Sequence, residues 1–188
     1  MLPGRRARTD TLFVRPGEEE GSTWRTGPGA SDEGTVAGVP EGHTIHRLAR
    51  RHVKLFGGQP LRASSPQGRF ADGAALIDGR TLEGTDAYGK HLFHRYGRDL
   101  FLHIHLGLYG KFTEGPLPAT EPRGALRLRL QGEATYLDLR GPITCEVITR
   151  GEKDAVTAAL GPDPLRPHAD PALAQAKLAA AAPPSAPC

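Results

Sequence analysis

The sequence predicts a mainly β protein with flanking helices, in which the strands form a sandwich or a barrel. Between Leu61 and Val147, short apolar runs recur at roughly even spacing and are separated by glycine-containing turns. This pattern is typical of all-β architectures. The segment before this region has the periodicity of an amphipathic helix, and a second helix is expected after it. The strand-rich region is therefore expected to form the core.

The first ordered element is predicted to be a helix that ends at Gly57-Gly58, because glycine commonly terminates helices. Its apolar residues recur at helical spacing, and they are Ile45, Leu48, Ala49, Val53 and Phe56. Its basic residues fall largely elsewhere on the helix, and they are Arg47, Arg50, Arg51 and Lys54. The helix is expected to bury the apolar face and to expose the cations.

The strands follow this helix. Leu92-Phe93 and Phe101–Leu106 flank a turn at Gly97-Arg98-Asp99, which predicts a hairpin. Leucine and arginine alternate between Leu126 and Leu130, which predicts a strand with one apolar and one cationic face. Tyr136–Leu139 is expected to form the next strand.

The two ends of the chain differ from its centre. Residues 1–38 are rich in Gly, Arg, Glu, Ser and Thr without any periodicity, so we expect a disordered extension. After a second helix expected at Glu152–Leu160, residues 167–188 form an irregular tail rich in alanine and proline. Its alanine-rich part, residues 172–182, has helical propensity but offers little surface to pack.

Composition limits the class of partner. The chain has 188 residues and a formal net charge of +3. Residues 1–38 hold five of the 24 Lys and Arg and six of the 21 Asp and Glu, so the positive excess lies entirely in the remainder. This favours a polyanionic partner only weakly. Cys145 and Cys188 cannot form a cysteine-rich zinc site, and no apolar run reaches membrane-spanning length.

Pro40 and Glu41 are the first candidates for catalysis. An internal proline is a tertiary amide and cannot attack a carbon, whereas an N-terminal proline is a secondary amine that can condense with an electrophilic carbon such as C1′ of a sugar. Glu41 could then protonate the sugar. The alternative is structural, because proline and glutamate are both favoured in the first turn of a helix.

Three further segments carry polar or exposed residues of interest. Lys90, beside a glycine near a strand, can approach a phosphate, or it is simply solvated. His103 and His105 share one face of a strand, as in some metal sites, and His91 and His94 could complete such a cluster. The turn at Gly107–Gly110 is expected to push Leu108 and Tyr109 outward as an apolar wedge for a DNA duplex, unless these side chains fold back into the core.

Five motifs stand in a fixed order: PEGHTIHRLAR, YGKHLF, HIHLGLYGKF, LDLRGP and LGPDPL. In this order and spacing the chain resembles the formamidopyrimidine-DNA glycosylase and endonuclease VIII family over residues 39–166, and its opening is similar to the actinobacterial endonuclease VIII-like branch. The resemblance implies a two-layered β-sandwich flanked by helices. It also implies a bacterial, cytoplasmic, nucleoid-associated monomer that repairs damaged double-stranded DNA.

The resemblance assigns roles to particular residues. Pro40 matches the Schiff-base nucleophile and Glu41 the proton donor, while Lys90 matches the lysine that contacts DNA phosphate near the lesion. Leu108 and Tyr109 match the intercalating loop. His105 and Arg140, which lie within two of the motifs, are assigned to DNA binding. Two positions depart from the pattern: Gly107 stands where some members of the branch carry glutamine, and Thr44 where many members have a second glutamate.

Both ends also depart from the family pattern. Val39 stands where the family has its initiating methionine, and a GTG codon can start translation in bacteria, so we expect residues 1–38 to precede the true start. A GTA, GTC or GTT codon at this position would contradict that expectation. Residues 167–188 stand where the family continues into a helix–two-turn–helix domain and a zinc or zincless finger. The tail is therefore expected to arise from out-of-frame translation of a GC-rich gene, and no cofactor is expected in this chain.

The sequence thus predicts a base-excision DNA glycosylase with AP lyase activity, represented by its catalytic domain at residues 39–166. Three alternatives remain open. One is a truncated, catalytically dead DNA-binding remnant, and another is a metal-dependent β-sandwich enzyme that uses His103 and His105. The third is an unstable fragment that aggregates, because the face that lines the interdomain cleft in the family is exposed.

Overall fold

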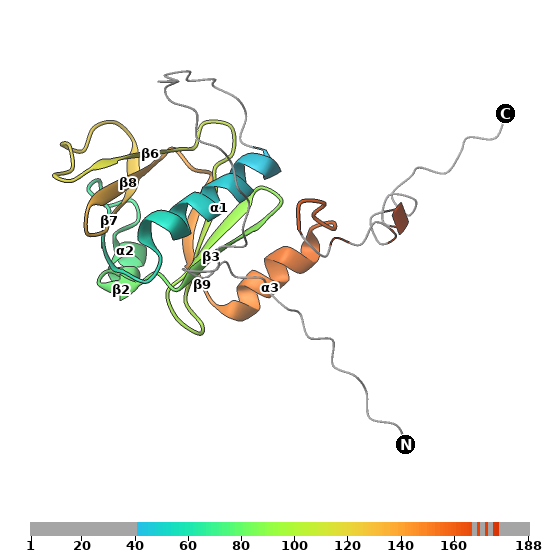
Figure 1. Cartoon of the computed structure of the whole chain (residues 1–188). Helices are drawn as coiled ribbons and strands as arrows, with labels where there is room; N and C mark the ends of the chain where they lie inside the picture. Colours follow the sequence, from blue (N-terminus) through green and yellow to red (C-terminus); the bar gives the residue numbers. More distant parts are fainter. Residues whose placement is uncertain (1–40, 167–168, 170–171, 173–174, 177–188) are drawn as a thin grey trace, which may run out of the picture.

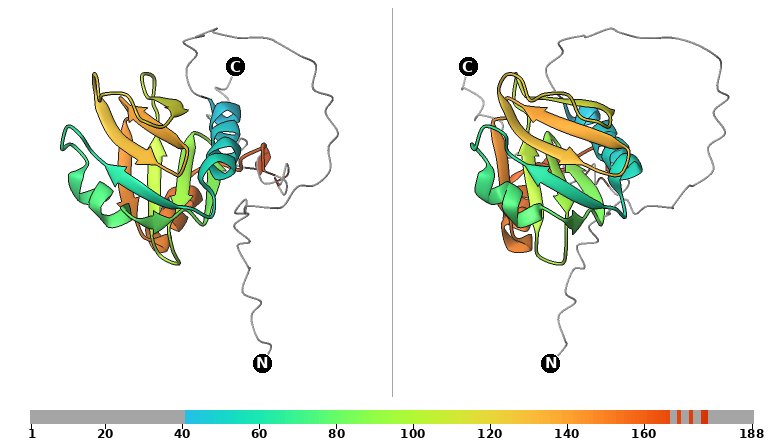
Figure 2. Two further views of the ribbon diagram at one scale, coloured as in Figure 1. Left: turned by 60° about the vertical axis from the view of Figure 1, so that its left-hand side comes forward. Right: turned by 90° about the vertical axis from the view of Figure 1, so that its left-hand side faces the viewer.

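The computed structural model describes residues 41–166, 169, 172, 175 and 176. Within these residues two antiparallel sheets face each other, and helices lie around them (Figure 1). The two layers are seen from the side in Figure 2. The mainly β, two-layered sandwich with flanking helices is therefore confirmed. The predictions for Pro40 and residues 1–38 lie outside the described residues, as does most of the tail at residues 167–188.

The sheets differ in size. One has the order β2-β1-β7-β8-β6, and its strands are β1 (Pro60–Ser64), β2 (Arg80–Thr81), β6 (Lys111–Pro116), β7 (Leu126–Gln131) and β8 (Thr135–Arg140). The other has the order β3-β4-β5-β9, and its strands are β3 (Gly84–Tyr88), β4 (His91–Arg95), β5 (Phe101–His105) and β9 (Thr144–Ile148). The predicted hairpin is the β4–β5 pair.

The core lies between the two layers and receives apolar side chains from both. The alternating leucines of β7 are all buried, as predicted, and Leu128 and Leu130 pack in one cluster with Leu92 of β4 and Ile104 of β5. Burial of one such side chain stabilises the fold by roughly 1.5–3 kcal/mol. The opposite face of β7 is not the free cationic face that the sequence predicts, because Arg129 is buried against Asp138 of β8.

Helix α1 (Gly42–Phe56) closes one side of the sandwich. Its buried residues include Ile45, Ala49 and Phe56, and Gly57 terminates it, as predicted. On one side the Thr85 hydroxyl of β3 donates to the Ala49 carbonyl at 2.7 Å. On the other side the helix contacts β6, where the rings of His52 and Phe112 lie 4.6 Å apart. Since β3 and β6 are edge strands of different sheets, α1 ties the two layers together.

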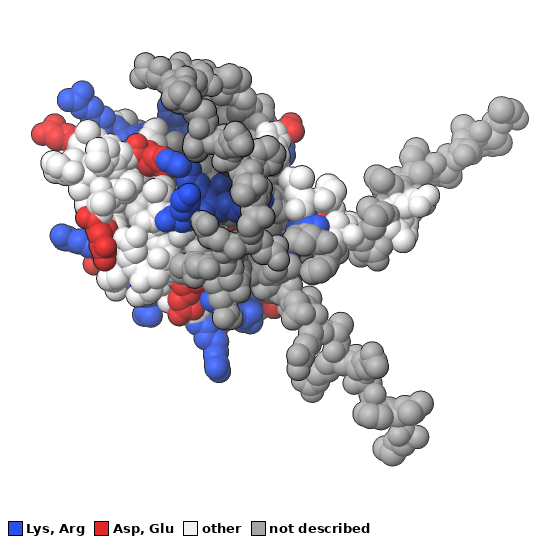
Figure 3. Space-filling view, in the orientation of Figure 1, with Lys and Arg blue, Asp and Glu red and all other residues white. Residues whose placement is uncertain are grey.

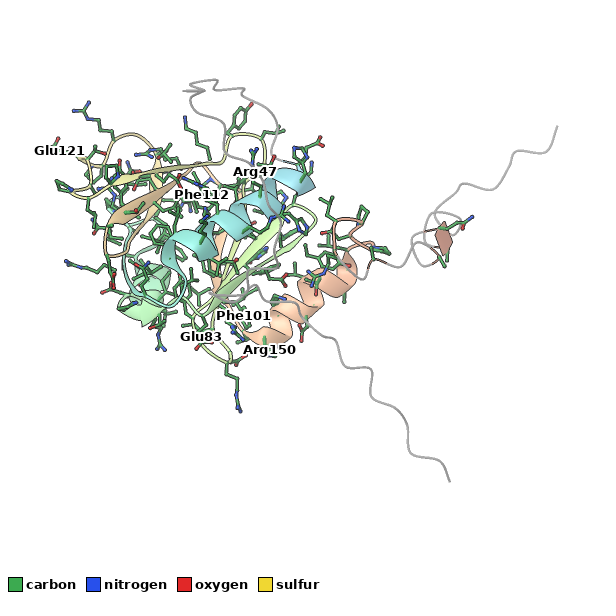
Figure 4. All side chains as sticks on the ribbon, in the orientation of Figure 1. Arg47, Glu83, Phe101, Phe112, Glu121 and Arg150 are labelled. Atoms are coloured by element: carbon green, nitrogen blue, oxygen red, sulfur yellow. The ribbon has the colours of Figure 1, made fainter. Side chains whose placement is uncertain are left out.

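The other two helices pack elsewhere. The short α2 (Ala71–Ile77), which the sequence did not reveal, packs against β1. Helix α3 (Arg150–Ala159) begins with a capping box formed by Thr149 and Glu152. Its Arg150 lies over the Phe101 ring of β5 at 5.5 Å (Figure 4), so α3 covers the outer face of the four-stranded sheet. No helix in the described ranges is long and apolar enough to cross a lipid bilayer.

Candidate active site

Three loops meet at one end of the four-stranded sheet. In the register of the sheet, His91 pairs with His105, and His105 pairs in turn with Thr144. The turn before His91, the segment after His105 and the loop before Thr144 therefore leave the sheet at the same end. These loops contain Lys90, the Leu108-Tyr109 pair and residues 141–143 respectively.

Lys90 lies at the end of a hairpin. Only Gly89 and Lys90 separate β3 from β4, and Tyr88 pairs with His91 across the turn. Gly89 has a φ of +54°, which a side chain would disfavour and which the first position of a tight hairpin turn requires. The turn leaves the Lys90 side chain exposed.

Glu41 immediately precedes α1. Its carbonyl accepts hydrogen bonds from the N–H groups of Thr44 and Ile45, so its backbone caps the helix. Its side chain makes no capping hydrogen bond and is exposed. Glu41 therefore stands just before the first turn of the helix and not within it, and its carboxylate is left accessible for other contacts. Pro40 lies outside the described residues.

The Asp163 junction joins the start of α1 to the Lys90 hairpin. We define it as Asp163 with the groups that it binds. Asp163 Oδ2 accepts from the Gly89 N–H at 2.8 Å and lies 2.7 Å from Nε2 of His46 on α1, while Oδ1 accepts from the Leu165 N–H at 2.9 Å. A β-carbon added to Gly42 would lie 3.4 Å from the Gly89 carbonyl oxygen. The start of α1, which follows Glu41, is therefore packed against the turn that precedes Lys90.

Leu108 and Tyr109 point away from the core. Their side chains are 62% and 86% exposed, so the outward turn predicted from the two glycines is confirmed and the alternative of folding back is wrong. The Gly110 N–H donates to the Leu106 carbonyl at 3.0 Å and closes the turn. Gly107 has a φ of +68°, which favours glycine at this position.

Ile143 is an exposed apolar side chain that joins this pair from another loop. It is 72% exposed, and its N–H donates to the His105 carbonyl at 3.0 Å. A β-carbon added to Gly107 would come within 2.3 Å of Ile143 Cδ1. Ile143 therefore fills the space that a side chain at position 107 would need. We call Leu108, Tyr109 and Ile143 together the tip.

A chain of histidines runs across the sheet beside Lys90. His103 Nδ1 lies 2.8 Å from the Glu146 carboxylate, and His103 Nε2 lies 2.8 Å from His91 Nδ1. Burial, with His103 and His105 nearby, lowers the pKa of His91 to about 4. Burial also lowers the pKa of His105, with smaller contributions from His103 and Lys90. The predicted residues Lys90 and His105 are thus neighbours, and His105 is neutral at pH 7.

The same contacts bear on the metal hypothesis. Both ring nitrogens of His103 are already engaged by protein groups. His94 does not join the cluster, because it pairs with His52 on the opposite face of β4 at 3.0 Å. The described part of the chain contains no group of three His, Cys, Asp or Glu side chains arranged to hold a metal ion.

Arg140 ends β8 near the tip, and its guanidinium is held by the protein itself. It donates to Asp138 at 2.8 Å, to the Thr113 hydroxyl at 2.6 Å and to the Arg123 carbonyl at 3.2 Å. Asp138 also binds Arg129 through both oxygens. Arg140 is half-buried and fixed in orientation, and its contact with DNA stays a prediction.

Basic side chains gather over α1. The exposed residues of this kind on the helix are Arg47, Arg50, Arg51 and Lys54. Lys and Arg lie in the middle of the face that Figure 3 shows, where Figure 1 places α1. Arg47, labelled in Figure 4, projects from this helix. Arg51 is paired with Glu114 of β6. This surface suits a polyanion.

Known proteins match the chain over the part that contains these loops. A model of the formamidopyrimidine-DNA glycosylase N-terminal domain matches residues 39–145. The chain belongs to this family.

Two bacterial relatives of this glycosylase family illustrate the similarity. Endonuclease 8 1 of Mycobacterium tuberculosis is 51% identical over 144 residues, which cover 74% of this chain and 54% of that protein. Probable endonuclease 8 2 of Streptomyces coelicolor is 31% identical over 138 residues, which cover 71% and 49%. The chain spans about half the length of these relatives.

Solved structures show that the fold is shared. MutM in complex with DNA containing carbocyclic 8-oxo-G superposes with a TM-score of 0.58 and 22% identity, covering 66% of this chain and 51% of that chain. A mutant of Lactococcus lactis FPG in complex with DNA containing Fapy-dG gives a TM-score of 0.59 at 22% identity, covering 66% and 50%. The fold of the glycosylase N-terminal domain is therefore present in this chain.

Sequence reasoning missed several residues at this end of the sheet. Asp163 lies within the LGPDPL motif, but only the fold shows that it reaches Gly89 and His46. Ile143 follows Gly141-Pro142, and an isolated apolar residue after a turn signal is the one indication the sequence offers. The sequence suggests His91 as a metal ligand, whereas the structure pairs it with His103.

Proposed function

We propose that this chain provides the catalytic domain of a bifunctional DNA glycosylase and AP lyase that removes oxidised bases, pyrimidines above all, from duplex DNA. The observation that supports it is the arrangement of Glu41, Lys90 and the tip around one end of the sheet. Glu41 follows Pro40 directly in the sequence. The endonuclease 8 relatives and the DNA-bound neighbours agree with this activity.

The proposed reaction begins at the amine of Pro40, once this residue is N-terminal. The nitrogen lone pair attacks C1′ of the damaged nucleotide, and the bond between C1′ and the base breaks with the base leaving. Breakage of the C1′–O4′ bond, with a proton delivered to O4′, opens the sugar ring, and loss of the proline N–H proton leaves an iminium between the nitrogen and C1′. The iminium withdraws electrons, so a proton is lost from C2′ and the 3′ phosphate is eliminated. Water then hydrolyses the imine and frees the proline. The chemistry requires no cofactor.

The other residues supply a proton and hold the duplex. The exposed Glu41 carboxyl protonates the sugar oxygen as C1′ is attacked. Lys90 binds a phosphate near the lesion, with His105 and Arg140 as further contacts along the backbone. Leu108 and Tyr109 fill the space that the flipped nucleotide leaves in the helix. The protein would act as a monomer on chromosomal DNA in the bacterial cytoplasm.

Borohydride trapping tests this proposal, because reduction of the imine links the protein covalently to DNA that contains an oxidised pyrimidine. A chain that begins at Pro40 is expected to be trapped, whereas Pro40→Gly and a chain that keeps residues 1–39 are not. Leu76→Ala, which changes an exposed side chain on α2, is the control that should be trapped normally. DNA binding without trapping would favour the role of a DNA-binding remnant over an enzyme.

A further inference from the structure

The LGPDPL segment at residues 160–165 belongs to the family resemblance, yet the proposed chemistry gives it no task. Its Asp163 is only 5% exposed. A buried carboxylate is costly unless hydrogen bonds replace its water shell. The groups that supply these hydrogen bonds therefore indicate what the residue is for.

One of these groups belongs to the hairpin that presents Lys90. Asp163 Oδ2 accepts from the Gly89 N–H at 2.8 Å, and Gly89 directly precedes Lys90. Consecutive α-carbons are about 3.8 Å apart, so fixing the Gly89 backbone also fixes the start of the lysine side chain. Besides this hydrogen bond, the turn is held by the strand pairing on either side and by packing against Gly42.

The second group belongs to α1. The same oxygen lies 2.7 Å from Nε2 of His46, one helical turn after the first residue of α1. A β-carbon added to Gly42 would lie 3.5 Å from Leu165 Cδ1, so the loop also packs against the start of the helix. A single oxygen atom is thus the common point of the helix and the hairpin.

The loop itself is fixed in place. Arg166 donates to the Asp86 carboxylate at 3.0 Å and to the Ala87 carbonyl at 2.8 Å, both on β3. Burial raises the pKa of Asp163, but hydrogen bonds from Gly89, His46 and Leu165 together outweigh it, and the net pKa is lowered. The carboxylate is therefore ionised at neutral pH and binds its donors in the stronger, charge-assisted form.

We propose that Asp163 is a positioning residue, which fixes Lys90 relative to the start of α1, where Glu41 lies. The inference rests on the proposed function, because it assigns Lys90 to a DNA phosphate and Glu41 to the reacting sugar. A small misplacement of one of two such groups is costly, since both must meet the same nucleotide at once. Asp163 sets the spacing of the two without touching either side chain.

A double-mutant cycle in the full 188-residue chain tests the proposal. The measured quantity is affinity for a duplex that contains a stable abasic-site analogue. Lys90→Ala is expected to weaken binding roughly tenfold in the wild-type background, as for loss of a charge-assisted contact. In Asp163→Ala the same change should weaken binding less than about threefold, because the lysine is no longer held in place. His46→Ala should act in the same direction, and it decides the question if Asp163→Ala fails to fold.

Asp78→Ala is the matched control. Asp78 also accepts a hydrogen bond from a backbone N–H, that of Ala63 at 2.8 Å, but it lies beside β1 in the other sheet. In this background Lys90→Ala should keep its full effect. An equal effect of Lys90→Ala in all four backgrounds would show that Asp163 has only a structural role, and the proposal would be overturned.

Amide hydrogen exchange gives a readout that does not depend on DNA. The Gly89 N–H should be protected in the wild type and should exchange at least about tenfold faster in Asp163→Ala. Unchanged protection would overturn the proposal. If protection depends on Asp163 but Lys90→Ala leaves wild-type binding unaltered, the phosphate contact of the proposed function is what has failed. In that case Asp163 still holds the Gly89 backbone, but its proposed role in positioning Lys90 is refuted.

Discussion

The Asp163 junction and the tip lie at the same end of the four-stranded sheet, but they are built in opposite ways. At the junction, one buried carboxylate binds donors from α1, from the Lys90 hairpin and from its own loop. At the tip, three apolar side chains are more than half exposed. The first arrangement fixes positions at the cost of burying charge, and the second keeps apolar surface available for a partner. The proposed function requires both, because it has to align reacting groups and to insert side chains into a duplex.

A second buried contact of α1 is the pair His52 and His94, which joins this helix to β4. Burial lowers the pKa of His94 from 6.5 to about 4, and it lowers that of His52 well below its usual range. A histidine with a lowered pKa stabilises the fold above pH 6.5, and this contribution is lost as the pH falls towards 4. For His94 alone the loss amounts to about 3 kcal/mol.

Urea unfolding at pH 7 and pH 4.5 measures this loss of stability, which is the largest effect that we expect. The double variant with His52→Leu and His94→Leu should lose clearly less stability over the same pH interval, because leucine does not titrate. A variant of the tip, Leu108→Ala, should show the wild-type pH dependence. An unchanged pH dependence in the double variant would mean that other groups determine the acid sensitivity.

Changes at the tip should have the opposite effect. They should lower the affinity for DNA and leave the free energy of unfolding nearly unchanged. Replacing Leu108 and Tyr109 together by alanine is expected to cost about 2 kcal/mol of affinity for the abasic-analogue duplex, since stacking against a base contributes about 1–3 kcal/mol. The free energy of unfolding should change by less than about 0.5 kcal/mol, as for other exposed side chains. Fluorescence anisotropy and urea unfolding measure the two quantities. Leu76→Ala, in α2, is the control, and an equal loss of affinity there would argue against a specific contact.

Ile143 should give the smallest effect. Its replacement by alanine removes part of one apolar contact, so affinity for the same duplex is expected to fall by about 1 kcal/mol or less. The variant should leave the turn at Gly107–Gly110 intact, because the hydrogen bonds of this turn are made by backbone groups. Affinity equal to the wild type, measured by anisotropy, would show that Ile143 lies outside the contact with DNA.

The sequence predicted those features that depend on neighbouring residues. The spacing of Ile45, Ala49 and Phe56 fixes the buried face of α1, and the glycines around Leu108 and Tyr109 indicate an exposed turn. It could not predict contacts that only the fold creates. The alternation in β7 suggests that Arg129 is free, but in the fold Arg129 forms a buried ion pair with Asp138 on the adjacent strand. Asp163 is likewise one carboxylate in a loop until the fold brings Gly89 and His46 to it.

The shared space of Gly107 and Ile143 has a consequence for how this protein family could diversify. In this chain the backbone of the turn favours glycine at position 107, both through its φ of +68° and through the isoleucine that lies against it. Whether the surface beside Leu108 is apolar or polar is instead determined by Ile143, which lies in a loop distant in sequence and is 72% exposed. A single codon change at position 143 could thus introduce a charge or an amide beside Leu108 without disturbing the turn. Under the proposed function, such changes would alter the surface that meets DNA, while the parts that align the chemistry stay unchanged.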